Sequence, residues 1–147
     1  MVNREKRDLA RRLVEKFLAC EITNDDFVND YPCQEKEDRV IIAIYDRLWG
    51  FWDDRHTHTL TGTGKHKLNP EATALLERCI AFLNSDFEYE WPPLEWRSLS
   101  QALLRLIGFG KIADRRGDEW TQRVRGFGNW EVWPFIREED LKKFRPA

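Results

Sequence analysis

The residues best suited to chemistry lie between positions 53 and 58 of the chain. Asp53, Asp54, His56 and His58 combine carboxylates with imidazoles, which serve as metal ligands and as general acids or bases. On a helix, an aspartate and a histidine three or four residues apart share one face. One interpretation is therefore a metal-dependent or acid–base enzyme that uses these four side chains. The other is a polar helix end, where histidine interacts favourably with the helix dipole.

The spacing of these residues favours the helix-end interpretation. A zinc site needs three or four convergent ligands. All three histidines lie within residues 56–66, far from the cysteines, and neither HExxH nor paired-cysteine spacing is present. The sequence therefore predicts no bound metal, no cofactor and no assigned catalytic residue. Whether His66 converges with His56 and His58 is left open.

Two other chemical signatures are weak. Residues 59–65 contain two glycines and a lysine but lack the GxxxxGK[ST] spacing of a phosphate-binding loop, and no apolar strand precedes them. A surface loop is the expected structure. No serine occurs in a GxSxG motif and no cysteine stands near a histidine, so nucleophilic catalysis has little support.

Acidic and aromatic side chains alternate in residues 86–91, which two prolines follow. An extended segment is expected, and the prolines exclude it from a central strand. Aromatic rings inside an acidic rim suit a basic protein partner. We predict a non-enzymatic protein-binding module of immunity or accessory type. The residues that we predict to bind the partner are Asp86, Glu88, Tyr89, Glu90 and Trp91.

Charge is unevenly distributed along a chain whose net charge is only −2. Residues 21–40 carry seven acidic and two basic side chains, and residues 81–100 carry four and one. These two segments could form one acidic face for a basic partner. The small net charge argues against a general attraction to nucleic acid.

The last third of the chain nevertheless offers an alternative, nucleic-acid binding. Basic residues alternate there with aromatic rings, on which bases could stack. The basic residues are Lys111, Arg115, Arg116, Arg123, Arg125 and Arg137. The aromatic residues are Trp120, Phe127, Trp130 and Trp133. A packed, charged subdomain is the simpler interpretation of the same composition.

Apolar periodicity and start and stop signals predict the elements that position these candidates. Thr23 and Asp26 form a capping-box pattern, with Ile22 and Phe27 spaced as a hydrophobic staple. An asparagine at 69 followed by proline is a second strong helix start. Helices are predicted over residues 5–20, 24–30, 35–55 and 69–84, and a fifth from Pro92 or Pro93 to about residue 107.

The prediction is a mainly α fold with about five helices around one core. Residues 1–147 are expected to form a single domain, with 5–107 as the helical core. Residues 109–147 could be an appendage, either irregular or a small β-hairpin, with a last helical turn from Glu138 to Phe144. The seven tryptophans and nine phenylalanines are expected mainly in the core.

Three cysteines without paired spacing indicate a reducing compartment. The charged N-terminus is unlike a signal peptide, and no apolar run is long enough for a membrane span. We therefore expect a cytoplasmic protein that does not enter membranes. Association of identical chains stays open.

Two stretches carry a resemblance to known proteins. Residues 38–54, DRVIIAIYDRLWGFWDD, and residues 85–92, SDFEYEWP, resemble small uncharacterised bacterial proteins. The resemblance covers the central third to half of the chain. It implies a compact, intracellular bacterial protein, and it carries over no activity.

Overall fold

Two helices, α1 (Arg4–Leu18) and α4 (Pro70–Leu83), run in opposite directions and form the centre of the molecule. The computed structural model describes residues 1–34, 37–49, 56–60, 68–92 and 126–144. Within these residues the fold is mainly α and contains no strand. The α-helices are α1 (Arg4–Leu18), α2 (Asn24–Asp30), α3 (Arg39–Leu48), α4 (Pro70–Leu83) and α7 (Glu138–Lys142), with a short 3₁₀-helix η2 (Trp130–Val132).

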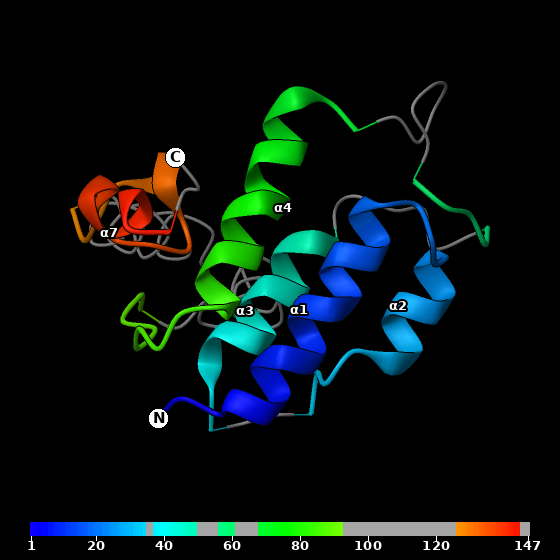
Figure 1. Ribbon diagram of the computed structural model, residues 1–147, viewed down its shortest axis with the longest axis horizontal. Coiled ribbons are helices and arrows are strands. Elements are labelled where there is room, and N and C mark those ends of the chain that lie inside the picture. The colour runs from blue at the N-terminus through cyan, green and yellow to red at the C-terminus, as the bar shows by residue number, and fades with distance from the viewer. Residues whose placement is uncertain (35–36, 50–55, 61–67, 93–125, 145–147) are drawn as a thin grey trace, which may run out of the picture.

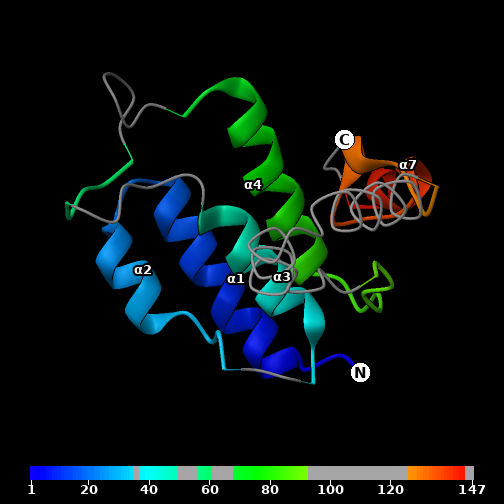
Figure 2. The same ribbon diagram turned by 180° about the vertical axis from the view of Figure 1, so that it is seen from behind.

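Helix α1 lies between α2 on one side and α4 on the other, and α3 packs beside it (Figure 1). The start of α1 contacts the end of α4, where the Arg7 guanidinium donates a hydrogen bond to the Ser85 carbonyl. The view from behind shows the same order of helices (Figure 2). The packing of α1 against α4 therefore forms the centre of the fold, and α2 and α3 pack against α1.

Helix α1 ends two residues earlier than the sequence predicts. The Cys20 amide donates to the Phe17 carbonyl and the Glu21 amide to the Lys16 carbonyl, the two bonds of a Schellman motif. Cys20 itself adopts a left-handed conformation with φ of 61°. The predicted helix over residues 5–20 included Cys20, but this turn places Cys20 outside the helix and on the surface.

Helix α2 confirms its predicted start and its bounds. The Thr23 hydroxyl accepts from the Asp26 amide, and the Asp26 carboxylate accepts from the Thr23 amide. The Thr23 hydroxyl also donates to this carboxylate, and the two bonds that the carboxylate accepts, from the hydroxyl and from the amide, hold its pKa below the usual value. Phe27 is buried, and Ile22 packs at the edge of the core.

Helix α3 begins at Arg39 rather than at residue 35. Asp38 occupies the N-cap position, yet its side chain does not cap the helix. Its carboxylate instead accepts bonds from Arg7 and from the Asn3 amide. A tertiary contact therefore sets this boundary. The predicted continuation of the helix over residues 50–55 lies outside the described residues.

Helix α4 agrees with its prediction at both ends. Asn69 caps the first turn by accepting from the Ala72 amide, and Pro70 is the first helical residue. Asn84 is the C-cap. The predicted fifth helix, from Pro92 or Pro93 to residue 107, lies outside the described residues.

Residues 126–144 pack into the same core as the helices. Val132, Trp133, Phe135 and Leu141 are buried in one cluster with α1, α3 and α4 side chains. This segment contains η2 and α7 and no strand. The structure therefore favours the irregular alternative over a hairpin here, and α7 confirms the predicted last helical turn.

Most described aromatic rings lie in the core, as the sequence predicts, whereas Trp49, Phe127 and Trp130 are exposed. The three cysteines form no disulfide. No helix in the described part of the chain is long and apolar enough to cross a membrane.

Candidate functional site

A buried ion pair joins three elements next to the acidic segment 86–91. The side chains of Arg7 and Asp38 are 0% and 2% exposed, and their Nε and Oδ2 atoms are 2.6 Å apart. Arg7 Nη2 also donates to Asp38 Oδ1 at 3.0 Å, and Nη1 donates to the Ser85 carbonyl at 2.9 Å. The guanidinium lies 5.4 Å from the centre of the Phe82 ring. The pair fixes the backbone from which the acidic segment begins.

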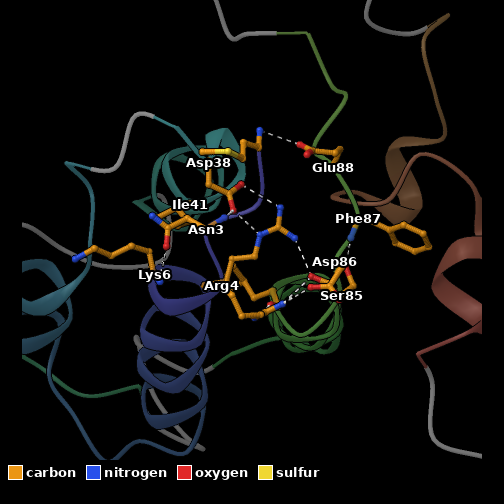
Figure 3. Close-up of polar contacts among 12 residues, drawn as sticks. Asn3, Arg4, Lys6, Asp38, Ile41, Ser85, Asp86, Phe87 and Glu88 are labelled. Carbon is orange, nitrogen blue, oxygen red and sulfur yellow. Dashed lines mark hydrogen bonds and ion pairs between the residues drawn. The ribbon is translucent and has the colours of Figure 1, made fainter.

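Arg4 extends this polar network to the surface. Its guanidinium donates to the Ser85 carbonyl, to the Leu83 carbonyl and to Asp86 Oδ1. A cation at the end of α4 is favourable because the last carbonyls of a helix carry partial negative charge. Figure 3 shows Arg4, Ser85 and Asp86 together at this helix end. Asp86 therefore contributes to structure as well as to surface charge.

Burial alternates along the acidic segment, as expected of an extended chain. The segment belongs to no helix and no sheet. Its acidic side chains face solvent and its aromatic rings face the protein. The exposed residues are Asp86, Glu88 and Glu90, and the covered residues are Phe87, Tyr89 and Trp91. The alternation in the sequence therefore places the carboxylates at the surface, as an acidic edge, and the aromatic rings beneath them.

Trp91 differs from what we expected of a binding residue, because it is a core residue. Its side chain is among the fully buried ones, with the whole residue 1% exposed. The indole Nε1 donates to the Pro134 carbonyl at 2.9 Å. Trp91 therefore anchors the C-terminal segment to the helices, and its ring cannot contact a partner directly.

Tyr89 is half-buried and has mainly internal contacts. Its hydroxyl accepts from Trp133 Nε1 at 3.2 Å, and Arg39 lies 5.8 Å from its ring centre. Burial raises the pKa of the Tyr89 phenol to about 12. It is therefore a neutral hydrogen-bonding group at physiological pH.

A pocket of about 200 Å³ lies between the acidic segment and the C-terminal segment. Its aromatic floor includes Phe82 and Phe135, whose rings meet edge to face at 5.0 Å. Glu88 and Glu90 line it from one side. The remaining lining includes Phe87, Pro134, Ile136, Arg137 and Asp140. We call this cavity the acidic pocket.

The charges around the acidic pocket are partly compensated. Glu88 Oε2 lies 3.0 Å from the amino group of Met1, and Asp140 Oδ1 lies 3.1 Å from Lys143 Nζ. That same Nζ lies 5.4 Å from the centre of the Phe87 ring. Glu90 is exposed and makes no ion pair with another described residue. Glu90 is therefore the carboxylate of this rim most available to a partner.

Among the described residues, the carboxylates of α2 and those of residues 86–90 do not share the single face that the sequence led us to expect. Both views place α2, which carries the exposed Asp25, Asp26 and Asp30, on the opposite side of α1 and α4 from residues 84–92 (Figures 1 and 2). Asp38 is buried. Helix packing, rather than charge, decided where the two segments lie.

The histidine segment is attached to the start of α2 through backbone atoms. The Asn24 amide donates to the His58 carbonyl, while the His58 amide donates to Asn24 Oδ1 and Asn24 Nδ2 donates to the His56 carbonyl. Thr57 Oγ1 also donates to Asp25 Oδ2. These bonds give the segment a structural role that does not depend on the imidazoles.

The remaining members of that group, Asp53, Asp54 and His66, lie outside the described residues. Among the residues that the structure does describe, no three His, Cys, Asp or Glu side chains are placed to hold a metal ion. The enzyme hypothesis therefore stays a prediction. Burial raises the pKa of the Cys79 thiol to about 12, so this cysteine is not a thiolate nucleophile at neutral pH.

The candidates for nucleic-acid binding are only partly described. Arg137 lines the acidic pocket, whereas Trp130 and Trp133 line a second pocket at the other end of α4. Phe127 is exposed and packs on Trp91, with ring centres 5.8 Å apart. Lys111, Arg115, Arg116, Trp120, Arg123 and Arg125 lie outside the described residues.

Sequence reasoning missed Phe135 and Asp140, which the C-terminal segment adds to the acidic pocket. Asp140 and Phe135 are about fifty residues from Glu88 along the chain, and no local pattern links them. For Arg7, a signal was present in the sequence. It precedes the buried residues Ala10 and Val14 at helical spacing, so it lies on the apolar face of α1. Because arginine is rarely fully buried, its position on this face was not predicted.

Comparison with protein-family models, with curated proteins and with solved structures finds no match for this chain. The geometry of its surfaces is therefore the basis on which its function is inferred.

Proposed function

We propose that this chain is a non-enzymatic protein-binding module, of the kind to which immunity and accessory proteins belong. Its binding surface is the acidic edge of residues 86–90 together with the acidic pocket. The partner presents a basic segment. The observation that carries the proposal is the alternation that directs Glu88 and Glu90 outward beside an aromatic-floored pocket.

The chemistry of the acidic pocket supports a lysine or arginine anchor from the partner. The partly exposed Phe87 ring can attract a cation through its face, and the carboxylates of Glu88 and Glu90 add direct electrostatic attraction. Lys143 already places an ammonium 5.4 Å from the Phe87 ring centre beside Asp140, so a cation is compatible with this surface. The long apolar stem of lysine or arginine would cover the floor.

The first prediction tests this surface by charge reversal. We expect Glu88→Lys/Glu90→Lys to weaken binding of a fluorescein-labelled lysine- and arginine-rich peptide by about tenfold or more, because two like charges then face the cations of the peptide. Fluorescence anisotropy with the full chain measures the affinity. The same variant is expected to lose any cellular partner that the unmodified protein retains in a pull-down.

Glu21→Lys/Asp30→Lys is the matched control, since both residues are exposed on the α2 side and the change in net charge is the same. It should leave peptide binding within about twofold. Equal weakening by both double variants would mean that net charge alone attracts the peptide, and the proposed surface would then be wrong. Circular dichroism confirms that each variant is folded.

The setting of this proposal is the bacterial cytoplasm. Three unpaired cysteines support a reducing compartment. The bacterial setting is proposed from the resemblance of residues 38–54 and 85–92 alone. Self-association would be a further outcome of the binding experiments rather than part of the proposal.

A further inference from the structure

A second pocket, of about 240 Å³, lies where the last turn of α3 approaches the first turns of α4 and the segment around η2. Two arginines, Arg47 and Arg78, and two tryptophans, Trp130 and Trp133, line it together with Glu71. Pockets that enclose drug-sized ligands are about 300–1,000 Å³. This volume therefore suits one aromatic ring system of a ligand, with any attached group lying toward solvent at the exposed Arg47.

Trp130 is placed as a stacking surface in this pocket. Its ring packs on the buried Trp91, with ring centres 4.5 Å apart and planes inclined by 42°, yet the residue remains 38% exposed. The Asn129 side chain accepts from the Glu131 amide and fixes the start of η2. A large ring that is supported from behind and exposed in front loses little conformational entropy when a planar group stacks on it.

The two arginines supply a positive charge beside this ring. Arg78 Nε donates to the Trp133 carbonyl at 3.1 Å, which orients its guanidinium at the pocket. Arg47 is exposed at the end of α3. Against these two cations the described lining holds one carboxylate, that of Glu71. Planar guanidinium groups match the geometry of phosphate oxygens.

From this combination we propose that the pocket binds a nucleobase with its adjoining phosphate, the base on Trp130 and the phosphate at Arg47. A base can stack on the exposed Trp130 indole, and its phosphate can accept hydrogen bonds from the exposed Arg47 guanidinium. The same chemistry occurs in a free nucleotide and in an unpaired nucleic-acid strand. This site is separate from the acidic pocket and does not depend on the proposed protein partner.

The second prediction measures binding of both sources to the full chain. The probes are a fluorescein-labelled thymidine oligonucleotide, followed by anisotropy, and adenosine monophosphate and inorganic phosphate, followed by calorimetry. Tight binding of the oligonucleotide with no binding of the mononucleotide at about 1 mM identifies a strand as the source. Equal affinity for both probes identifies a free nucleotide. Either result supports the proposed chemistry.

Variants of the pocket distinguish a site from a structural effect. Trp130→Ala should weaken binding about tenfold, with Trp130→Phe intermediate, because stacking depends on ring area. Arg47→Ala should weaken binding and reduce the salt dependence of an oligonucleotide complex by about 0.7 in slope, the value for one phosphate contact on a single strand. Glu71→Gln should strengthen binding, since it removes the one carboxylate among the described lining residues.

Arg12→Ala is the control, because Arg12 is an exposed cation on α1, away from the pocket. It should leave every affinity unchanged. The proposal is overturned if neither nucleotide probe binds at about 1 mM, or if inorganic phosphate binds as tightly as adenosine monophosphate. It is also overturned if Trp130→Phe and Arg47→Ala, both folded, bind as well as the unmodified chain.

Discussion

Arg7 shows how much a single side chain can organise in this molecule. Its guanidinium and the Asp38 carboxylate are almost fully removed from solvent, and together they join α1, the start of α3 and the end of α4. Removing two charges from water is costly, and good geometry with additional hydrogen bonds is needed to offset that cost. Both conditions hold here, because the Asn3 amide and the Ser85 carbonyl complete the network.

The third prediction follows from this pairing. Arg7→Met should lower the free energy of unfolding by about 3–5 kcal/mol, because the Asp38 carboxylate is then buried without its counter-ion. Arg7→Met/Asp38→Leu should recover much of that loss, since apolar groups replace both charges. Urea denaturation of Arg7→Met, Asp38→Leu and the double variant measures the coupling free energy between the two side chains. Additive losses would show that the two side chains act independently.

At the scale of elements, the end of α1 carries a strained residue. Cys20 adopts φ of 61° in the Schellman turn, a conformation that suits glycine and is unfavourable for a residue with a Cβ atom. Its thiol donates a weak hydrogen bond to the Leu18 carbonyl, with the sulfur 3.8 Å from the oxygen. A thiol is a weak donor, so this bond offsets little of the cost of the backbone conformation.

The fourth prediction is that Cys20→Gly stabilises the protein by about 0.5–1 kcal/mol, because glycine adopts this φ without a steric penalty. Cys20→Ala is the comparison, since alanine also lacks the thiol but keeps the Cβ atom. Thermal unfolding in the presence of a reductant measures both. If the glycine and alanine variants unfold at the same temperature, relief of backbone strain is not the cause of any stabilisation.

At the scale of the whole molecule, α4 links two surfaces of different chemistry. Phe82, near the C-terminal end of α4, lines the acidic pocket. Glu71, near the N-terminal end of α4, lines the pocket that also contains the two arginines and two tryptophans. The C-terminal segment contributes to both, and it is held by Trp91, whose indole bonds to the Pro134 carbonyl. Docking of this segment is therefore a condition for either proposed function.

The fifth prediction tests that docking at Gly128. A Cβ atom there would lie 3.0 Å from Ile136 Cγ2 and 3.1 Å from Trp91 Cη2, and the buried tryptophan ring has little freedom to move. Gly128→Ala should lower the free energy of unfolding by about 1–3 kcal/mol through overpacking. Urea denaturation measures the loss.

A second variant separates overpacking from a general effect of alanine at this position. Ile136→Ala removes one of the two groups that the new methyl would meet. In the Ile136→Ala background, the added cost of Gly128→Ala should therefore be smaller than in the unmodified chain. An unchanged cost would contradict the proposed steric cause.

The sequence by itself determined the elements whose signals are local. The capping box of Thr23 and Asp26 and the Asn69–Pro70 start are satisfied within a few residues, so α2 and the start of α4 could be predicted. The alternation in residues 86–91 is also local, and it separated outward carboxylates from covered rings. Backbone geometry over a few residues sufficed in each case.

Only the tertiary structure decided which of these local features meet. It removed Asp38 from its capping role by pairing it with Arg7, and it buried Trp91 under the C-terminal segment. It also placed the carboxylates of α2 away from those of residues 86–90 and brought Arg47 and Trp130 to one pocket. Such contacts join residues that are distant along the chain, and their outcome depends on how helices pack rather than on any local pattern.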